Sequence, residues 1–557
     1  MDINSIQKDL KKKNINACLF MHGNLFINED ILEDENQILK LTNFSGSYAI
    51  LLILQTKSYL FVDGRYELQA KNEVNTKKIE IIKLSKISLI DWLKSNFPKT
   101  SSILYNPWEI SLSQLANLQI NLPLIDFIEN VNGTKNLSPN IAKTFQHHKK
   151  FNLLSSKEKQ QKVIKYLKKK KLTSYLITSP SNVSWLLNLR SNALPYSPIF
   201  RGYALLNIDG SMKVFADNTD LKTALPIDSL KKELANIKKL GLDFHTTPSI
   251  IKSFSDSFIN VPDIIDNLKS IKDKTELKGI IEAHIRDGVA VSKFIYWLEK
   301  NYHNQTELDI KDKLLSYRKK EKNFYSESFA TISAYGPNGA IVHYNPTKKT
   351  NLTLKKGSLL LLDSGGQYYD GTTDITRTIA IGKPTDEMIE KATLVLKSHI
   401  ALASSLFPEN TFGSELDLIA RQPLLKHNLD YLHGTGHGVG YFSNVHEGPH
   451  RISIYAKKSA SLQKNMITSI EPGFYKENSF GIRIENLYYI KEKKNTSLLS
   501  FEPLTLVPID KTLINKYLLT KDEETWINTY HKQVFNTLKK YLTKQELIWL
   551  KEKTSPL

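Results

Sequence analysis

The chain has 557 residues, which is too long for a single hydrophobic core and predicts two or three domains. A content of 41% hydrophobic and 24% charged residues excludes an intrinsically disordered protein. The formal charge of +19 comes from 76 basic and 57 acidic residues, but the lysine runs are typical of solvated helix faces and no nucleic-acid-binding motif accompanies them, so we expect no nucleic-acid partner.

Cysteine usage and hydropathy narrow the class further. Cys18 is the only cysteine, which excludes a disulfide framework and a multi-thiolate metal site. Any metal ion must therefore be held by oxygen and imidazole ligands. The first residues contain no apolar signal region, and no run approaches the roughly 18 apolar residues of a membrane span. We expect a cytoplasmic protein with no membrane partner.

The order of elements in the first 150 residues recurs in the next 70. A basic helix from residue 5, an apolar run at 17–21 and strands at 48–54 and 59–62 are followed by a basic helix at 157–171 and strands at 174–178, 203–208 and 212–216. Tyr48-Ala49-Ile50-Leu51 matches Tyr203-Ala204-Leu205-Leu206. The recurrence predicts two related α/β domains in tandem, with convergent strand composition as the alternative.

Polar and proline-containing segments mark the domain boundaries. The basic segment 147–150 follows a loop with Pro139, and Val261-Pro262 precedes a new long helix. We therefore expect domains at 1–148, 149–268 and 269–557.

Two amphipathic helices are predicted in the third domain. The first has Leu277, Ile281, Ile285 and Val289 on one apolar face. The second follows Pro384 and has one face that carries Met388, Ala392, Val395 and His399. The strand-rich segments between and after these helices hold most of the residues that can support chemistry.

A predicted hairpin brings two aspartates together in this domain. Asp363 ends the apolar run 359–362, and Asp374 opens an alternating segment after a glycine-rich turn at 365–371. Two carboxylates buried side by side need a cation or a proton to neutralise them, and a divalent metal ion is the simplest solution. Turn formation alone is the structural alternative for an aspartate followed by glycines.

Further candidate ligands follow along the chain. The segment HGTGHGVGYFSNVHEGPH places four histidines, His433, His437, His446 and His450, in glycine-rich chain that allows close approach of a ligand. Glu471 follows the apolar strand 466–470 at a turn, and Arg483 and Glu485 are expected on one face of an alternating strand. Each has a structural alternative: a satisfied core histidine, or a plain arginine–glutamate ion pair.

The combined set consists of four carboxylates and one imidazole: Asp363, Asp374, His437, Glu471 and Glu485. This much anionic charge suits two hard or borderline ions, with Mn²⁺ or Co²⁺ preferred over Zn²⁺. Two ions that share a water molecule can drive hydrolysis at neutral pH.

The motifs GPNGAIVHY (336–344), LLDSGGQYYDGTTDITRT, HGTGHGVGYFSNVHEGP, SIEPGFY and GIRIEN occur in an order and spacing that resemble aminopeptidase P, the Xaa-Pro aminopeptidase family of the pita-bread metallopeptidases. FVDGRYELQA, VSWLLNLRSNALPYSPIF, AHIRDG and FEPLTLVPID resemble its long, three-domain form. The resemblance covers nearly the whole chain. It implies an α/β (α+β) fold with two tandem creatinase-like N-terminal domains followed by a pita-bread catalytic domain.

The resemblance also implies roles for particular residues. Asp363, Asp374, His437, Glu471 and Glu485 would bind two ions, typically manganese, and Glu471 would also shuttle a proton. His343 and His446 would hydrogen-bond the scissile carbonyl, as preorganised donors do. His433 and Arg483 would shape the pocket for proline, and Arg65, in the first domain, would contact peptide.

The implied activity is removal of the amino-terminal residue from peptides with proline second. Prolidase, which takes dipeptides, is the nearest alternative; methionine aminopeptidase needs no pair of upstream domains, and a non-catalytic pita-bread binding module loses ligands that are present here. The segment around Trp526, Tyr530 and Ile548 is expected to be a helical extension, and the long form implies a homodimer. Ser181-Asn182 departs from the family, which often has an acidic residue there.

Overall fold

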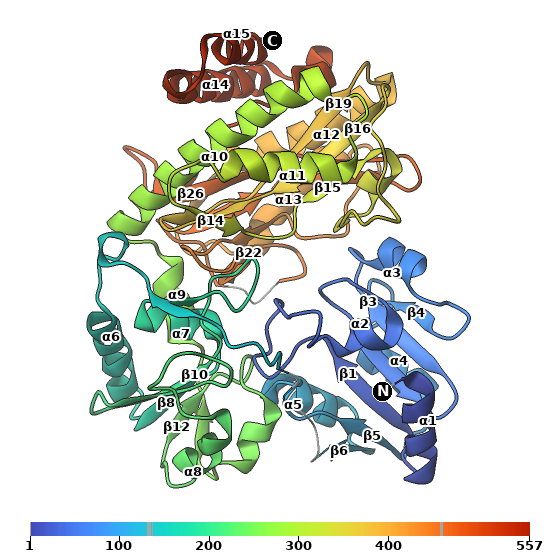
Figure 1. Cartoon of the computed structure of the whole chain (residues 1–557), viewed down its shortest axis with the longest axis vertical. Coiled ribbons are helices and arrows are strands. Elements are labelled where there is room, and N and C mark those ends of the chain that lie inside the picture. Colours follow the sequence, from blue (N-terminus) through green and yellow to red (C-terminus); the bar gives the residue numbers. More distant parts are fainter. Residues whose placement is uncertain (1, 131–134, 136, 457–459) are drawn as a thin grey trace. The chain divides into compact units, whose positions relative to one another are not determined.

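The computed structural model describes residues 2–130, 135, 137–456 and 460–557. It divides into two compact units (Figure 1). The first comprises Met1–His147, Leu154–Leu194 and Ile199–Ile265, and the second comprises His148–Leu153, Pro195–Pro198 and Asp266–Leu557. Every predicted site residue except Arg65 belongs to the second unit.

The first unit contains two mixed sheets. The first sheet has the strand order β4-β3-β2-β1-β5-β6. Its strands are β1 (Ala17–Met21), β2 (Ile50–Leu54), β3 (Ser58–Val62), β4 (Glu80–Lys83), β5 (Ser101–Tyr105) and β6 (Ile125–Glu129). Helices α1 (Ile3–Lys12), α2 (Gln37–Thr42), α3 (Glu67–Glu73), α4 (Leu89–Asn96) and α5 (Leu112–Asn121) accompany them. Apolar side chains of both faces are buried, as expected for a sheet covered by helices.

The second sheet repeats this pattern with the order β11-β10-β8-β12-β13. Its strands are β8 (Ser174–Ile177), β10 (Tyr203–Asn207), β11 (Met212–Phe215), β12 (Leu240–Leu242) and β13 (Phe258–Asn260). Strand β1 is antiparallel to β2 and parallel to β5, and β8 is likewise antiparallel to β10 and parallel to β12. The shared topology supports the expectation of two related domains. Helices α6 (Ser156–Lys169), α7 (Pro180–Leu187) and α8 (Leu230–Leu234), with β7 (Thr144–Gln146) and β9 (Leu189–Ser191), complete the unit.

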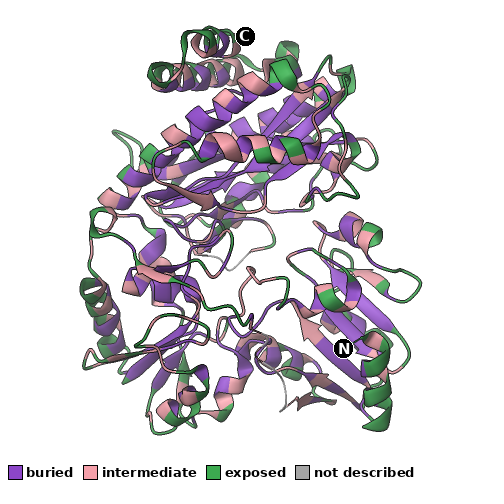
Figure 2. Cartoon of the chain, in the orientation of Figure 1, coloured by how far each residue is buried: buried purple, intermediate pink, exposed green. Residues whose placement is uncertain are grey.

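The second unit is built from several sheets under long helices (Figures 1 and 2). A six-stranded sheet has the order β20-β27-β26-β23-β21-β22, and three-stranded sheets have the orders β15-β16-β19 and β14-β17-β18. The first of these sheets contains β20 (Leu406–Pro408), β21 (Gly436–Gly438), β22 (Glu447–Ile452), β23 (Ile467–Ile470), β26 (Asn486–Glu492) and β27 (Leu498–Pro503). The others contain β14 (Phe324–Glu327), β15 (Ile332–Tyr335), β16 (Ser358–Ser364), β17 (Gly366–Tyr368), β18 (Gly371–Thr372) and β19 (Ile375–Ile381), and β24 (Gly473–Lys476) pairs with β25 (Phe480–Arg483).

The helices of this unit are α9 (Ile264–Ser270), which begins in the first unit, and α10 (Lys274–Asn301), α11 (Glu307–Arg318), α12 (Asp386–Ala403), α13 (Gly413–Leu425), α14 (Lys521–Leu538) and α15 (Lys544–Lys553). The predicted inner face of α12 is confirmed, because Met388, Ala392, Val395 and His399 are all buried. The C-terminal segment forms helices α14 and α15, and Tyr530 and Trp549 belong to the main core cluster, whereas Ile548 of the predicted pattern is exposed. Within the described residues, no helix combines the length and apolar character that crossing a membrane requires.

The predicted apolar face of α10 is wrong, because Val289 is the one buried residue of its four predicted members. Ile281 is exposed, and Leu277 and Ile285 are only partly buried, whereas the buried line runs through Ile280, Ala283, His284, Asp287, Val291, Phe294 and Leu298. A spacing of four residues advances 40° beyond a full turn at each step, so that it drifts off any one face of a long helix. Polar residues on the inner face concealed the true pattern, since Asp287 is buried against Arg318.

One predicted turn and one predicted strand differ from expectation. The glycine-rich turn between Asp363 and Asp374 contains β17 and β18, which pair with each other, and β17 also pairs with β14. The segment GIRIENLYYI is not one strand, because the chain leaves β25 after Arg483 and enters β26 at Asn486 in another sheet. This change of sheet places Glu485 at a junction, where its backbone nitrogen donates to Thr376 O at 3.1 Å.

Candidate metal centre

The five predicted ligands lie on or beside strand ends of two sheets. Asp363 is on β16, opposite Thr376 of β19, and Asp374 immediately precedes β19. His437 is on β21, Glu471 directly follows β23, and Glu485 directly precedes β26. Strands β23 and β26 are antiparallel neighbours, which brings Glu471 and Glu485 to the same end of these two inner strands of the large sheet.

Distances between side chains define a compact cluster. His437 Nε2 lies 3.5 Å from Asp374 Oδ2 and 3.4 Å from Glu471 Oε1. One ligand atom from each of Asp374, His437 and Glu485 falls within 4.8 Å of the others. Ser469 Oγ donates to Glu471 Oε1 at 3.0 Å and accepts from the backbone nitrogen of His437. The cluster therefore offers carboxylate and imidazole atoms at distances that one or two cations can bridge.

The buried oxygens of this cluster test whether a cation fits. Among the described residues, Asp363 Oδ1, Asp374 Oδ1 and Glu485 Oε1 are buried side-chain atoms with no hydrogen-bond partner. An unpaired carboxylate oxygen is costly to bury, and three in one site call for a positive counterpart. Hard divalent ions take such oxygens as ligands, and the residues present thus fit a metal centre.

Protonation equilibria also reflect the crowding of negative charge at this site. Burial, together with the nearby Asp363 and Glu471 carboxylates, raises the pKa of Asp374 to about 6. Burial and the Asp374 and Glu471 charges raise the pKa of Glu485 well above its usual value. In the metal-free protein these two side chains hold protons more tightly than in the unfolded chain, so that a metal ion must displace protons in order to bind.

This competition makes the metal-free protein sensitive to pH. The pKa of Asp374 is higher in the folded than in the unfolded protein, so that protonation of Asp374 stabilises the folded state. This stabilisation is fully present below pH 4 and is lost as the pH rises through about 6. We expect the free energy of unfolding to fall by on the order of 2 kcal/mol across this window. Calorimetry of chelator-treated protein between pH 4 and 7.5 measures this change in the free energy of unfolding. Saturating Mn²⁺ is expected to cancel the decline. The same dependence on pH in the Asp374→Asn variant would contradict the assignment of the decline to Asp374.

A second layer of polar residues holds the ligands. Arg483, which is buried, donates from Nη2 to Asp363 Oδ2 at 2.7 Å, from Nε to Thr376 Oγ1 at 3.2 Å and from Nη1 to Tyr475 Oη at 2.7 Å. Thr376 Oγ1 in turn donates to Glu485 Oε2 at 2.9 Å. Arg483 therefore orients Asp363 directly and Glu485 through Thr376. Its pKa lies well above the usual value, since the nearby Tyr475 and carboxylates outweigh burial.

His433 is connected to the same network. Its Nε2 lies 2.9 Å from Tyr475 Oη, and its ring lies 4.7 Å from that of Tyr431. Sequence reasoning missed Thr376, Tyr475 and Ser469. The available signals were the alternation that puts Thr376 on the face of Asp374 and the polar Ser469 within an apolar strand two residues before Glu471.

The remaining predicted residues are placed as follows. The exposed ring of His446 stands edge-to-face on that of His437, with centroids 4.4 Å apart. His343 is half-buried in the loop after β15. His450 is fully buried, its Nε2 lies 2.8 Å from Ile467 O, and burial lowers its pKa to about 4, as for a core histidine. Arg65 belongs to the first unit, where its Nη2 donates to Asp63 Oδ2 at 2.7 Å.

Glycines permit close approach around His437. A Cβ atom on Gly438 would lie 2.2 Å from Glu447 O, and one on Gly436 would lie 2.1 Å from Ser469 O. Neither position can accept a side chain without movement of backbone, which explains the glycines that flank His437. The glycine-rich composition noticed in the sequence therefore reflects tight packing of β21 between β22 and β23.

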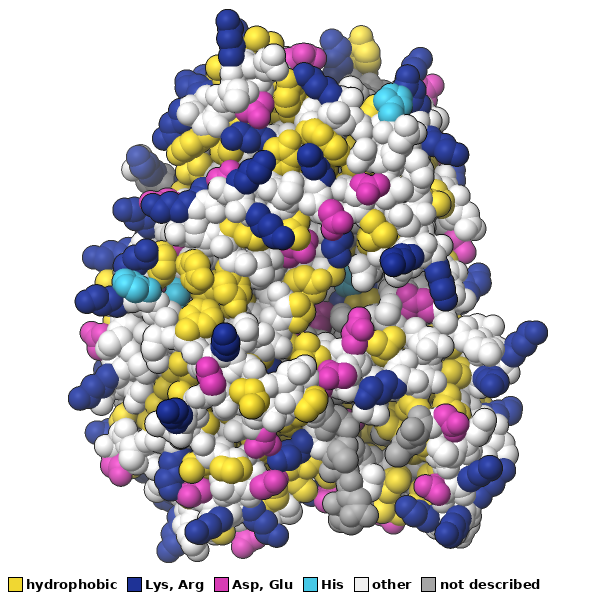
Figure 3. Space-filling view, viewed as in Figure 1, with side chains coloured by type: hydrophobic (Ala, Val, Ile, Leu, Met, Phe, Trp, Pro, Cys, Tyr) yellow, Lys and Arg dark blue, Asp and Glu magenta, His cyan; other side chains and the backbone are white. Residues whose placement is uncertain are grey.

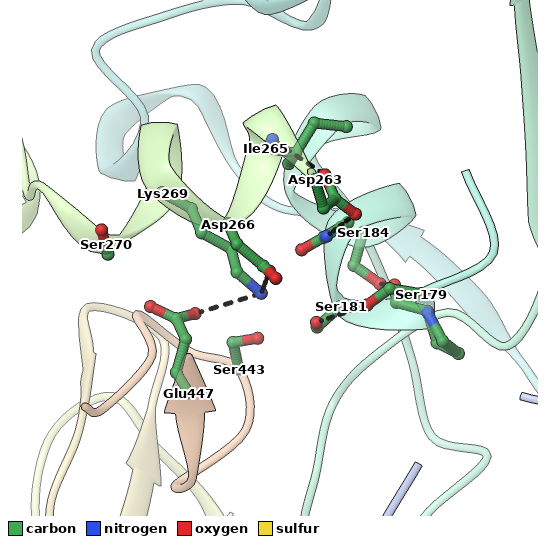
Figure 4. Close-up of polar contacts among 12 residues, drawn as sticks. Ser179, Ser181, Ser184, Asp263, Ile265, Asp266, Lys269, Ser270, Ser443 and Glu447 are labelled. Atoms are coloured by element: carbon green, nitrogen blue, oxygen red, sulfur yellow. Dashed lines mark hydrogen bonds and ion pairs between the residues drawn. The ribbon is translucent and has the colours of Figure 1, made fainter. Parts of the chain in front are cut away.

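A buried charge cluster lies directly after His446. Lys272 Nζ donates to Glu447 Oε1 at 2.5 Å. Lys269 Nζ lies 3.7 Å from Glu447 Oε2 and 3.3 Å from Asp266 Oδ1, as Figure 4 shows. Burial alone would raise the pKa of Glu447, but the ammonium groups of Lys272 and Lys269 lower it below its usual value. The cluster connects α9 and the segment between α9 and α10 to β22.

The excess of basic residues does not form one patch on the face drawn in Figure 3. There, lysine and arginine side chains are scattered among hydrophobic and acidic ones. This distribution is typical of solvated helix faces.

Comparisons with known families match the chain along most of its length. The profile of metallopeptidase family M24 matches residues 278–492, and the C-terminal region of that family matches residues 497–557. Profiles of the creatinase/prolidase N-terminal domain match residues 3–132 and 135–276.

Individual relatives also match this chain over nearly its whole length. A probable Xaa-Pro aminopeptidase P of Laccaria bicolor is 34% identical, with 93% of this chain and 87% of that protein covered. Xaa-Pro aminopeptidase 1 of Dictyostelium discoideum is 32% identical over 100% of this chain and 96% of its own. The crystal structure of the X-prolyl aminopeptidase of Caenorhabditis elegans, described as a cytosolic enzyme with a di-nuclear active site, superimposes with a TM-score of 0.92 at 29% identity and covers 98% of this chain and 95% of that chain.

Proposed function

This chain belongs to metallopeptidase family M24, as do its relatives that are named Xaa-Pro aminopeptidases, and we propose on that premise that it removes the amino-terminal residue from peptides whose second residue is proline. Its fold is mixed α/β, with two creatinase-type N-terminal domains before a pita-bread domain. The observation that carries the proposal is the cluster of Asp363, Asp374, His437, Glu471 and Glu485, in which three buried carboxylate oxygens have no hydrogen-bond partner among the described residues.

The cluster would hold two divalent metal ions. When bound, such ions lower the pKa of a water molecule and polarise a carbonyl group. Manganese is the proposed metal, with Co²⁺ or Zn²⁺ as alternatives, because oxygen ligands outnumber the single imidazole and no thiolate is present.

The side chains around the cluster have separate roles in this proposal. Glu471, which is partly exposed and held by Ser469, accepts and returns a proton at its carboxylate. His343 and His446 donate hydrogen bonds to the scissile carbonyl oxygen as charge develops on it. His433, Arg483 and Arg65 would bind peptide, and Arg483 also keeps Asp363 in place.

Proline at the second position explains why a dedicated enzyme is needed. Its nitrogen has no hydrogen and its ring fixes φ, so such peptides fit poorly into sites that read an extended backbone. Prolidase activity on dipeptides is the alternative within the same fold. The two N-terminal domains and the coverage of full-length Xaa-Pro aminopeptidases favour peptides longer than two residues.

Three further properties belong to the proposal: a cytoplasmic location, a homodimer and domains at 1–148, 149–268 and 269–557. A relative described as cytosolic supports the first, the resemblance to the long family form supports the second, and the two separate N-terminal sheets support the third.

A peptide assay tests the activity. Metal-stripped protein should be inactive on an Xaa-Pro-Yaa tripeptide, and Mn²⁺ should restore release of the amino-terminal residue. An Xaa-Ala-Yaa tripeptide is the matched control and should be cleaved far more slowly. Higher turnover of the Xaa-Pro dipeptide than of the tripeptide would favour prolidase, and inactivity on every peptide with Mn²⁺, Co²⁺ and Zn²⁺ would contradict a catalytic role.

A further inference from the structure

A buried glutamate far from the metal ligands in sequence lies against the loop that carries His343. Glu307 is the first residue of α11 and is fully buried. The loop runs from the end of β15, through the short helix Gly336–Ala340, to residue 352. Neither residue type nor periodicity distinguishes Glu307 from the other acidic residues at helix starts.

The Glu307 carboxylate accepts hydrogen bonds from four donor groups, one of which, Asn338 Nδ2, reaches both oxygens. Oε1 accepts from Tyr335 N at 2.7 Å and from Asn338 Nδ2 at 3.0 Å. Oε2 accepts from Tyr344 Oη at 2.8 Å and from Leu352 N at 2.9 Å. Four donors saturate an ionised carboxylate, and bonds to a charged acceptor are stronger than neutral ones.

These donors come from both ends of the loop and from its interior. Tyr335 is the last residue of β15, Asn338 and Tyr344 lie within the loop, and Leu352 closes it. The backbone reinforces the closure, because Glu307 N donates to Leu352 O at 3.1 Å. One side chain thus holds the start, middle and end of the loop, and His343 is the residue directly before one of the anchored positions.

We propose that Glu307 is a positioning residue for catalysis, which holds His343 where its ring can reach the scissile carbonyl. The inference rests on the proposed function for the role of His343. Glu307 does not touch substrate and acts only through the loop. Misplacement of a catalytic group by about 1 Å can cost about a hundredfold in rate, so that such an anchor has a kinetic consequence.

The Glu307→Gln variant isolates this role. The glutamine side chain has the same size, but its NH₂ group takes the place of one acceptor oxygen and faces groups that are themselves hydrogen-bond donors. We expect kcat/KM to fall about tenfold to a hundredfold, mainly in kcat, and the Mn²⁺ dissociation constant to change by less than about twofold. Asp309→Asn is the matched control, because Asp309 is exposed on the same helix and caps its start through Thr306.

A double-mutant cycle separates positioning from general structural support. In a His343→Ala background, Glu307→Gln should lower activity by less than about twofold, because the residue it acts through is absent. Equal losses in both backgrounds would overturn the inference. Tyr344→Phe removes a single donor and should give a smaller loss of about threefold in the same direction, which keeps the test available if Glu307→Gln fails to fold.

Limited trypsin digestion gives a readout that does not depend on activity. Lys348 and Lys349 are exposed within the loop. Cleavage after them should accelerate at least about fivefold in Glu307→Gln but not in Asp309→Asn, since proteolysis follows the population of the open loop. If the wild type cleaves no peptide, the proposed function fails while digestion still decides whether Glu307 holds the loop. Unchanged digestion together with unchanged kcat would overturn the inference.

Discussion

Replacement of Asp374 by Asn is expected to lower kcat/KM by at least about a thousandfold. Asp374 is buried, Asp374 Oδ2 is 3.5 Å from His437 Nε2, and its other oxygen has no hydrogen-bond partner among the described residues. An amide keeps the shape of the side chain but removes the charge and one acceptor, so that two divalent ions can no longer be balanced.

The same substitution should have the opposite effect on the stability of the metal-free protein. Since the pKa of Asp374 is raised to about 6, ionisation at pH 7.5 opposes folding, and a neutral amide removes this penalty. We expect the free energy of unfolding of the chelator-treated protein to rise by on the order of 2 kcal/mol. Urea denaturation with and without Mn²⁺ measures both the gain and the loss of metal-dependent stabilisation.

A matched control uses the same chemical change on the surface. Asp386 is exposed at the start of α12, and Asp386→Asn should change neither activity nor stability by more than about 0.5 kcal/mol. Retention of Mn²⁺-dependent activity in Asp374→Asn would remove Asp374 from the metal centre. Destabilisation of the metal-free protein by Asp374→Asn, to the same extent as by Asp386→Asn, would contradict the raised pKa of Asp374.

Replacement of Arg483 by Met should cause the largest loss of stability. The guanidinium group is buried and donates to Asp363, Thr376 and Tyr475. Removal of one partner from a buried ion pair typically costs about 3–5 kcal/mol, because the other charge stays buried without compensation. Urea denaturation of the metal-loaded protein measures the loss.

Metal affinity should fall in the same variant. Asp363 would lose the donor that orients it, and residues that orient metal ligands typically contribute about tenfold to a hundredfold to affinity. Arg483→Lys keeps the positive charge but not the planar guanidinium group, so that its Mn²⁺ affinity should lie between those of the wild type and of Arg483→Met. Arg451→Met, an exposed arginine on β22, is the control and should be close to wild type. Unchanged Mn²⁺ affinity in Arg483→Met would limit Arg483 to a role in the substrate pocket.

Much of the fold could be predicted because its strands are short apolar runs bounded by polar turns. β1, β8 and β23 lie where the apolar runs predict them, and the repeated helix–strand order indicated two domains with the same strand topology. The buried face of α10 could not be read in this way. Its inner side contains Asp287 and His284, whose burial depends on partners such as Arg318 from another helix.

The candidate ligands were recognisable because they sit where strands end, beside glycines that allow close packing. Their supporting residues were not, because hydrogen bonds between distant segments leave no local pattern. Thr376 and Glu485 are 109 residues apart, and Arg483 and Asp363 are 120 residues apart. A buried arginine and a glutamate two residues later can form a simple ion pair or serve a metal centre, and only the neighbours distinguish these cases.

The sequence by itself determined which ligand types the candidate site can offer, since Cys18 is the only cysteine and the candidate set consists of four carboxylates and one histidine. Its ordered motifs also identified the family, because spacing along the chain survives without knowledge of contacts. The tertiary structure decided which side chains hold those ligands: Arg483 on Asp363, Thr376 on Glu485, and Glu307 on the loop of His343. These pairings depend on which strand ends and loops meet in space, and that information arises only when the whole core packs.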